Sequence, residues 1–257
     1  MRSEPVLVLF CGGMSGSEAE DLLGGALRAS ALDLLERSLN SGAYDGAIVV
    51  ADEAAAAAFS GKLPANAVLD ADIPGKPFHF GRRLSDVVRR YGLERPVYAG
   101  CGLPLLTADE MGAIAMALRP AAGKLVVANN YYSADLAGFT PGSVVDEVEI
   151  PNNDRILPRL LTLEAGFTNY PLPRTIANQF DLDSTGDLAV LRYAGGAGPR
   201  LQAYLEAAAL DTTRLADAAR LFTDKMAEVL VAGRVGSQVW QYLESETACR
   251  VRMFSEE

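Results

Sequence analysis

Short apolar runs alternate with longer amphipathic stretches over the first three-quarters of the chain. Four runs have the length and composition of buried strands: residues 6–10, 46–51, 95–99 and 124–128. Apolar residues recur at the spacing of one helix face at 22–39, 54–59, 83–91, 108–118 and 155–165. The Gly24-Gly25 pair predicts a break in the first of these helices. The alternation predicts an α/β fold in three layers, with a mostly parallel sheet and helices on both faces.

The pattern changes after the glycine-rich segment 195–198, which has the composition of a linker. Beyond it, Ala- and Leu-rich amphipathic helices are predicted at 201–210 and 214–231. We therefore expect an α/β domain of residues 1–195 and a helical C-terminal extension of residues 196–257. The extension carries apolar side chains, Trp240 and Phe254 among them, that are expected to pack on the domain or on a second copy, forming a homo-oligomer.

The composition excludes some classes of partner. The chain has 257 residues, of which 49% are hydrophobic, and a formal net charge of −10, so nucleic acid is an unfavourable partner. Its apolar run at the N-terminus is too short for a membrane span or a signal-peptide core. Cys11, Cys101 and Cys249 lie far apart without metal-ligand spacing, which favours a reducing cytoplasm over a disulfide scaffold.

The segment from Gly100 to Glu110 is where we expect the functional site. It follows the strand at 95–99 and leads directly into the helix at 108–118. The Thr107 hydroxyl is placed to cap that helix, and Glu110 completes a capping box. Open α/β sheets bind ligands at turns of this kind, although a Gly-Cys-Gly-Leu-Pro sequence also suits a tight turn without function.

A glycine-rich loop, made by Gly12, Gly13, Ser15 and Gly16, follows the first strand and precedes a helix. Glycines let backbone N–H groups approach a phosphate, and a helix N-terminus favours its negative charge. A plain tight turn is an equal alternative. A dinucleotide-binding loop is less favoured, because the acidic residue that it needs, here Asp52, comes too late in the sequence.

Residues 5–192 carry three segments that resemble, in the same order, motifs of the MobA-like nucleotidyltransferases, the molybdenum-cofactor and phospholactate guanylyltransferases. Residues 100–110 resemble their turn Gly-Asp-hydrophobic-Pro-Leu-Leu-Thr. The glycine loop resembles Leu-Ala-Gly-Gly-x-Ser-x-Arg-Met-Gly-x-x-Lys, and residues 180–188 resemble Phe-Asp-Ile-Asp-Thr-Pro-Glu-Asp-Leu. The resemblance implies a nucleotide-diphospho-sugar transferase-like fold. On it, a nucleoside triphosphate with Mg²⁺ would transfer its nucleotidyl group to an acceptor phosphate or hydroxyl.

The resemblance also implies roles for individual residues. The glycine loop and Gly102 would bind the nucleotide, as would Arg82, for which a solvated helix face is the alternative. Independently of the resemblance, Asn129, Asn130 and Asp135 carry amide and carboxylate groups that suit recognition of a polar acceptor, although polar loops at strand ends often simply face water.

Asp183, in the segment 180–188, would hold the metal and act in catalysis, or would instead cap the helix that follows it.

The chain departs from the family at the metal-binding position of the turn at 100–110 and at the phosphate-binding positions of the glycine loop. Gly102 stands at the metal-binding Asp, Ser17 replaces the Arg, and no Lys follows. Loss of one such group can lower a rate by about 10²–10³. We therefore expect a nucleotidyltransferase with a degenerate active site, or a non-catalytic nucleotide- or partner-binding protein on the same fold.

Overall fold

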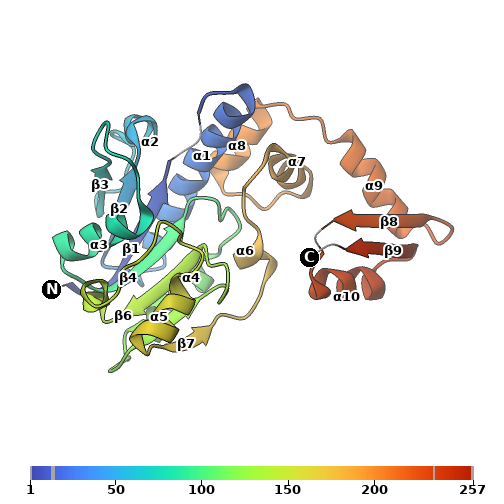
Figure 1. Ribbon diagram of the computed structural model, residues 1–257. Helices are drawn as coiled ribbons and strands as arrows, with labels where there is room; N and C mark the ends of the chain where they lie inside the picture. Colours follow the sequence, from blue (N-terminus) through green and yellow to red (C-terminus); the bar gives the residue numbers. More distant parts are fainter. Residues whose placement is uncertain (1, 13–14, 234, 256–257) are drawn as a thin grey trace. The chain divides into compact units, whose positions relative to one another are not determined.

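A seven-stranded sheet forms the centre of the computed structural model, which describes residues 2–12, 15–233 and 235–255 (Figure 1). The strand order is β3-β2-β1-β4-β6-β5-β7. The strands are β1 (Arg2–Cys11), β2 (Gly46–Ala51), β3 (Ala67–Ala71), β4 (Leu93–Gly100), β5 (Leu125–Ala128), β6 (Leu136–Thr140) and β7 (Thr168–Pro171). Only β6 runs antiparallel to its neighbours, β4 and β5, so the predicted mostly parallel sheet is confirmed.

The strand β1 is buried on both faces, which explains its unbroken apolar sequence. Val6 and Val8 belong to a core cluster on one face. Leu7 and Leu9 are equally buried, and because side chains alternate along a strand they point to the opposite face.

Helices cover both faces of the sheet, as predicted (Figure 1). The helical elements of this part of the chain are α1 (Glu18–Asn40), α2 (Glu53–Phe59), α3 (Phe80–Tyr91), α4 (Ala108–Leu118), η1 (Gly142–Asp146), α5 (Leu157–Ala165), α6 (Ile176–Gln179), α7 (Thr185–Ala194) and α8 (Pro199–Ala207). Side chains of α3, η1 and α5 share the core cluster with the strands, whereas α1 and α4 pack on the other face. The described part of the chain contains no helix with the length and apolar character to span a bilayer.

The predicted helix break at Gly24-Gly25 is wrong, because α1 continues through both residues. The reason for a small residue at 25 is the approach of α8. The Tyr204 hydroxyl donates a 2.9 Å hydrogen bond to the Leu22 carbonyl, and a Cβ at position 25 would overlap the Tyr204 ring. Gly25 is therefore a packing position rather than a helix terminator.

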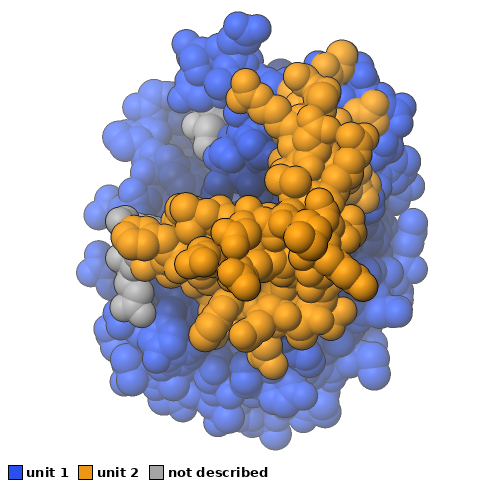
Figure 2. All heavy atoms as spheres, turned by 90° about the vertical axis from the view of Figure 1, so that its right-hand side faces the viewer, with its two compact units in different colours: residues 1–188, 196–208 blue, residues 189–195, 209–257 orange. Residues whose placement is uncertain are grey.

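Helix α8 belongs to the same compact unit as the sheet, beyond the boundary predicted at residue 195. That unit comprises residues 1–188 and 196–208 (Figure 2). The buried Asp33 carboxylate accepts hydrogen bonds from the backbone N–H groups of Leu201 at 2.9 Å and Arg200 at 3.1 Å. It satisfies N–H groups that Gly198, the N-cap residue, cannot reach with a side chain.

The second compact unit, residues 189–195 and 209–257, contains strands as well as the predicted helices. Its elements are α9 (Thr213–Thr223), β8 (Glu228–Gly233), α10 (Ser237–Glu246) and β9 (Arg250–Ser255), and β8 pairs in parallel with β9. The helix predicted over 214–231 is wrong beyond Thr223. After a turn, the β-branched Val229 and Val231 alternate with more exposed residues along β8, a pattern that favours a strand.

Candidate functional site

A cavity of about 470 Å³ opens at the carboxyl ends of β1 and β4. Gly12 follows β1, Gly102 follows β4, and both line the cavity together with Asp183. The parallel pairing of β1 with β4 brings the loops after both strands to the same edge of the sheet. Asp183 is added by the contact of its segment with the Gly102 turn, where the Leu182 N–H donates to the Gly102 carbonyl.

Aromatic side chains form one wall of the cavity. Phe10, Phe80 and Tyr98 lie in mutual edge or tilted contact, with ring centroids 4.9–5.6 Å apart, and Phe78 meets Phe10 at 6.3 Å. Phe10 and Tyr98 sit near the ends of neighbouring strands, which is why their rings meet. This wall is apolar and fixed in position by packing.

Four aspartates that interact with one another also line the cavity: Asp135, Asp154, Asp181 and Asp183. Asp135 immediately precedes β6, and its carbonyl accepts a 2.9 Å hydrogen bond from the Gly100 N–H. Because β6 runs antiparallel to β4, the start of β6 lies beside the end of β4. The antiparallel direction of β6 therefore places Asp135 at the edge of the sheet where β1 and β4 end.

Burial and mutual repulsion change the protonation of two of these carboxyl groups. Burial, with the charges of Asp135 and Asp183, raises the pKa of Asp181 to about 7. Burial, with the charges of Asp154 and Asp183, raises the pKa of Asp135 to about 6. The two groups therefore change charge near neutral pH, and a bound cation would favour their ionised forms.

Asp154 is held by an aromatic hydroxyl. The Tyr98 hydroxyl donates a hydrogen bond to the Asp154 carboxylate. Burial and the Asp154 carboxylate raise the pKa of Tyr98, so this phenol stays protonated as a donor. The bond ties the aromatic wall to the acidic side of the cavity.

Asp181 occupies the space that a side chain at position 102 would need. A Cβ on Gly102 would overlap Oδ1 of Asp181. The backbone is fixed there as well, because the Leu182 N–H donates a 2.9 Å hydrogen bond to the Gly102 carbonyl. The carboxylate that the MobA-like motif carries at position 102 is thus missing, and a carboxylate from another segment lies in its place.

The cavity is strongly acidic. Six aspartates line it, and Arg155 is the one cationic side chain among its described lining residues. The Arg155 charge acts to lower the pKa of both Asp135 and Asp181, but burial and repulsion outweigh it. In the described ranges, three or more His, Cys, Asp or Glu side chains are nowhere grouped so that they could hold a metal ion by themselves.

Comparison with known proteins shows the fold. The sequence matches no protein-family model and no curated protein. A protein of Desulfovibrio desulfuricans G20, provisionally named a nucleotide-diphospho-sugar transferase, is 14% identical and superposes with a TM-score of 0.54, covering 82% of this chain and 100% of that one. A nucleotidyl transferase of Methanothermobacter thermautotrophicus is 18% identical, with a TM-score of 0.55 and coverage of 74% and 97%. A cytidylyltransferase of Leptospira borgpetersenii is 16% identical, with a TM-score of 0.52 and coverage of 79% and 93%.

The chain has the nucleotide-diphospho-sugar transferase-like fold. This confirms the fold that the motif resemblance implied. In this chain the cavity lies between Gly12, after β1, and the turn at Gly102, after β4.

Of the predicted glycine loop, Gly12 is the residue that the structure places in the cavity lining. A Cβ on Gly12 would come within 2.8 Å of Oδ2 of Asp52, so the close approach of Asp52 requires glycine there. Ser15 and Gly16 are exposed and are not among the described lining residues. Gly13 lies outside the described residues.

Arg82 does not line the main cavity. It is exposed and lines a smaller neighbouring cavity of about 110 Å³ with Lys76 and His79. His79 caps α3 by accepting a 3.3 Å hydrogen bond from the Arg82 N–H. The two cavities share Asp72 and Phe78 in their linings.

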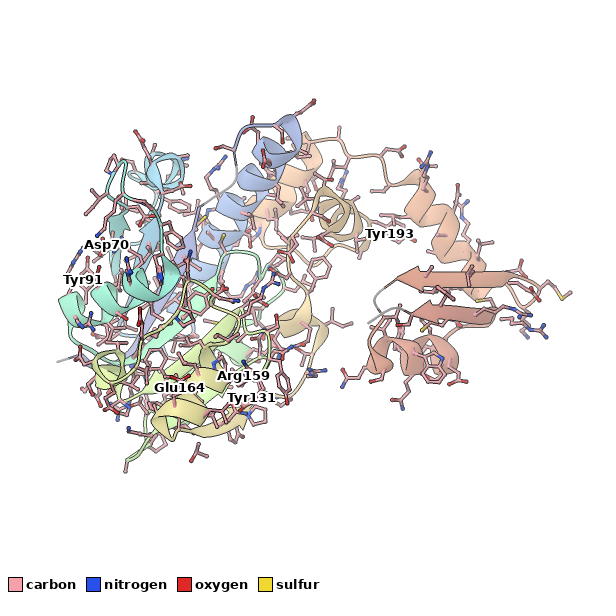
Figure 3. The ribbon with its side chains drawn as sticks, viewed as in Figure 1. Asp70, Tyr91, Tyr131, Arg159, Glu164 and Tyr193 are labelled. Atoms are coloured by element: carbon pink, nitrogen blue, oxygen red, sulfur yellow. The ribbon has the colours of Figure 1, made fainter. Side chains whose placement is uncertain are left out.

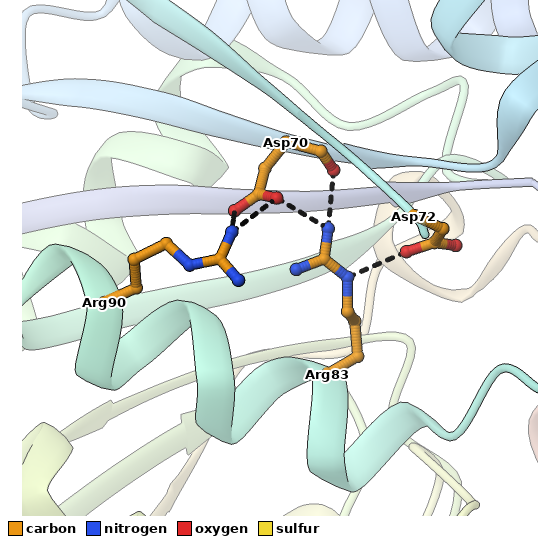
Figure 4. Close-up of polar contacts among 4 residues, drawn as sticks. All are labelled: Asp70, Asp72, Arg83 and Arg90. Carbon is orange, nitrogen blue, oxygen red and sulfur yellow. Dashed lines mark hydrogen bonds and ion pairs between the residues drawn. The ribbon is translucent and has the colours of Figure 1, made fainter. Parts of the chain in front are cut away.

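Arg83, the neighbour of Arg82, is fully engaged in structure (Figure 4). Its guanidinium lies 2.8 Å from the buried Asp70 carboxylate and 2.7 Å from Asp72, and Arg90 reaches Asp70 at 2.9 Å. Tyr91 lies beside Asp70 in Figure 3, and burial together with the Asp70 carboxylate raises the pKa of Tyr91. Burial acts to raise the pKa of Asp70, but Arg83 and Arg90 outweigh it and hold that pKa below its usual value. These contacts join α3 to β3.

The predicted acceptor residues divide into structural and cavity positions. Asn129 is buried; its amide group donates to the Asn178 carbonyl at 2.8 Å and accepts from the Leu136 N–H at 3.2 Å. The Asn130 side chain accepts from the Tyr132 N–H at 3.0 Å and so shapes its own loop. Of the three predicted residues, Asp135 is the one whose carboxylate lines the cavity.

Asp183 does not cap the helix after it. Ser184 and Asp187 cap α7 reciprocally: the Ser184 hydroxyl accepts from the Asp187 N–H at 3.3 Å, and the Asp187 carboxylate accepts from the Ser184 N–H at 2.8 Å. The Asp183 side chain is exposed and lines the cavity. Sequence reasoning selected Asp183 but missed Asp181, although the alternation Asp-Leu-Asp around the buried Leu182 places both carboxylates on the same side of the segment.

Proposed function

We propose that the protein binds a nucleoside triphosphate in this cavity and transfers its nucleotidyl group to a small phosphorylated or hydroxylated acceptor. The observation that carries the proposal is the set of aspartates gathered beside Gly12 and Gly102 at the carboxyl edge of the sheet. Open α/β sheets bind their ligands at this edge. The motifs that resemble MobA-like nucleotidyltransferases support the same chemistry.

A divalent cation, Mg²⁺ in the family that the motifs resemble, would be held by Asp181 and Asp183 together with phosphate oxygens of the nucleotide. The aspartates fit this role because their repulsion raises the pKa of Asp181, and a cation would relieve it. Since the described carboxylates do not form a metal site by themselves, the nucleotide has to complete the ligand set, as is common for Mg²⁺. A bound cation would neutralise charge on the transferring group.

Backbone groups and one guanidinium would hold the nucleotide. The loop from Gly12 to Gly16 would offer its N–H groups to the phosphates at the start of α1. Arg155 would pair with a phosphate oxygen. Arg82 would contact only a ligand that extends into the smaller cavity.

Asp135 is placed to act on the acceptor. With a pKa of about 6 it is mostly ionised at neutral pH but still basic enough to take a proton from an acceptor hydroxyl. The loop of Asn130 would contribute polar contacts, whereas the buried Asn129 would hold that loop in position.

A second candidate is a protein that binds the nucleotide without turning it over. The observation that favours it is the charge of the cavity, in which six aspartates face the single guanidinium of Arg155 among the described lining residues. Transition-state charge in nucleotidyl transfer is stabilised by preorganised cations. A cavity with one such cation favours binding over rapid chemistry.

Thermal unfolding with each nucleoside triphosphate, with and without Mg²⁺ or Mn²⁺, tests both candidates. We expect one triphosphate to raise the melting temperature by several degrees only with the cation, since ligand at about 100 times its Kd adds about 2.7 kcal/mol. Asp183→Asn should abolish the rise. The control Asp45→Asn changes an exposed aspartate before β2, at the opposite edge of the sheet, and should keep it.

Three outcomes separate the possibilities. Stabilisation by no triphosphate contradicts both candidates. Stabilisation that is independent of the cation and unchanged in Asp183→Asn would show that the nucleotide binds outside this cavity. When binding is established, release of pyrophosphate in the presence of a cell metabolite extract supports the transferase, and its absence supports the binding protein.

A further inference from the structure

Two cysteines lie on the floor of the cavity, where two neighbouring parallel strands end. Cys11 is the last residue of β1, and Cys101 directly follows β4. The register pairs Phe10 with Gly100, so Cys11 and Cys101 occupy the next step along the two strands. Both are free thiols, 5% and 7% exposed, and both line the cavity.

The two thiols are close enough to interact. The neighbouring Cys101 thiol, together with burial and the nearby Asp52 charge, raises the pKa of Cys11 well above its usual value. Neighbouring strands lie about 4.7–4.9 Å apart. This spacing falls within the Cα separation of roughly 4.4–6.8 Å that a disulfide spans.

We propose that Cys11 and Cys101 form a reversible disulfide across the floor of the cavity. The oxidant is a small disulfide that enters the cavity. One thiol loses its proton, its sulfur attacks a sulfur of the small disulfide, and one small thiol leaves with that proton. The second cysteine then gives up its proton and displaces the other small thiol. Two protein thiols and one small disulfide thus become one protein disulfide and two small thiols.

The bond would link the two segments that form the nucleotide end of the cavity. Gly12 follows Cys11 and Gly102 follows Cys101, so a covalent link fixes both turns and adds bulk to the floor beneath a ligand. A ligand bound over the floor would in turn shield the thiols. This last consequence rests on the proposed nucleotide binding, whereas formation of the disulfide does not.

The test uses the full reduced chain incubated with oxidised glutathione, followed by alkylation of the remaining thiols and mass spectrometry. We expect a product that has lost two hydrogens, carries no glutathione, contains the Cys11–Cys101 cross-linked peptide and is reversed by dithiothreitol. Cys249→Ser, which removes the cysteine of the other compact unit, should give the same product. Cys101→Ala should stop at glutathione bound to Cys11 or remain unreacted.

Two results would overturn the proposal. One is a wild-type chain in which glutathione stays attached to Cys11 or Cys101, and the other is a chain in which both remain reduced while Cys249 reacts. Because the wild-type product decides the matter, a poorly folding variant does not affect it. With a stabilising triphosphate and Mn²⁺ at ten times the Kd, oxidation should slow about tenfold. An unchanged rate would count against nucleotide binding over the floor while leaving the disulfide itself established.

Discussion

The charge of Asp181 opposes folding, and in the proposed function it favours cation binding. Its carboxyl group is partly buried beside Asp135 and Asp183, and its pKa rises from 3.8 to about 7. A carboxyl group with a raised pKa stabilises the folded chain when protonated, so its contribution is greatest below about pH 4 and is lost as the pH rises through about 7. Active sites commonly keep such unfavourable charges for function.

We predict that Asp181→Asn stabilises the protein at pH 8. The substitution removes a crowded charge and keeps an oxygen that can accept a hydrogen bond. The expected gain is on the order of 1 kcal/mol after allowance for solvent screening, and it should shrink toward pH 4. Melting temperatures of both proteins from pH 4 to 8 measure it. A variant that is less stable than wild type at pH 8 would show that the carboxylate has a structural role.

Gly102 provides a second test at the residue scale, because a Cβ there would overlap the Asp181 carboxylate. Gly102→Ala should cost about 1–3 kcal/mol by overpacking. The same change in an Asp181→Gly background should cost much less, which a double-mutant cycle in urea measures. Gly123→Ala, at a position with open space, is the matched control. Equal costs in both backgrounds would mean that Asp181 does not fill the space beside residue 102.

Single residues were predictable where a local pattern defines them. Gly12 and Gly102 share the cavity because the turns after neighbouring parallel strands meet at one edge of the sheet, and Asp183, which lies between α6 and α7, was selected by its motif. Asp181 could not be selected in the same way, since its role depends on the contact of its segment with the Gly102 turn, some 80 residues earlier in the chain. The contact of Cys11 with Cys101 likewise depends on strand order and register.

Helix α1 shows how packing between elements overrides local propensity. Gly24 and Gly25 suggest a break, yet the helix continues because α8 packs against it through Tyr204. A glycine in a helix interior costs roughly 0.5–1 kcal/mol relative to alanine. The close packing of the two helices offsets that cost.

Gly25→Ala should therefore destabilise the protein although alanine is the better helix former. The Cβ would overlap the Tyr204 ring, and we expect a loss of about 1–3 kcal/mol. Gly112→Ala in α4, where the Cβ would meet open space, should stabilise by up to about 1 kcal/mol. Urea unfolding of both variants measures the difference. If Gly25→Ala also stabilises the protein, Tyr204 of α8 does not approach Gly25 of α1 closely.

The elements themselves followed from periodicity where the sequence contains strong apolar runs, as in β1 and β2. The capping box of Thr107 and Glu110 is present at the start of α4, as predicted. Periodicity did not predict the direction of β6, and it did not identify β8 as a strand. Strand pairing is set by partners distant in the sequence, and an Ala- and Leu-rich segment leading into Val229 and Val231 is ambiguous between helix and strand.

At the scale of the whole molecule, the chain combines a nucleotide-diphospho-sugar transferase-like unit with a second, smaller unit. The change in composition after residue 195 indicated two parts. It could not show that α8 belongs with the sheet, because that depends on contacts of Asp33 with the start of α8, more than 160 residues later. All described lining residues of the proposed site belong to the first unit.

The measurement that tests the proposed function most directly is a crystal structure of the full chain with Mn²⁺ and a non-hydrolysable analogue of the stabilising triphosphate, with anomalous scattering recorded for manganese. We predict an anomalous peak at the carboxylates of Asp181 and Asp183, with the triphosphate between that peak and the loop at Gly12. Nucleotide bound outside this cavity, or manganese bound away from both aspartates, would contradict the proposal.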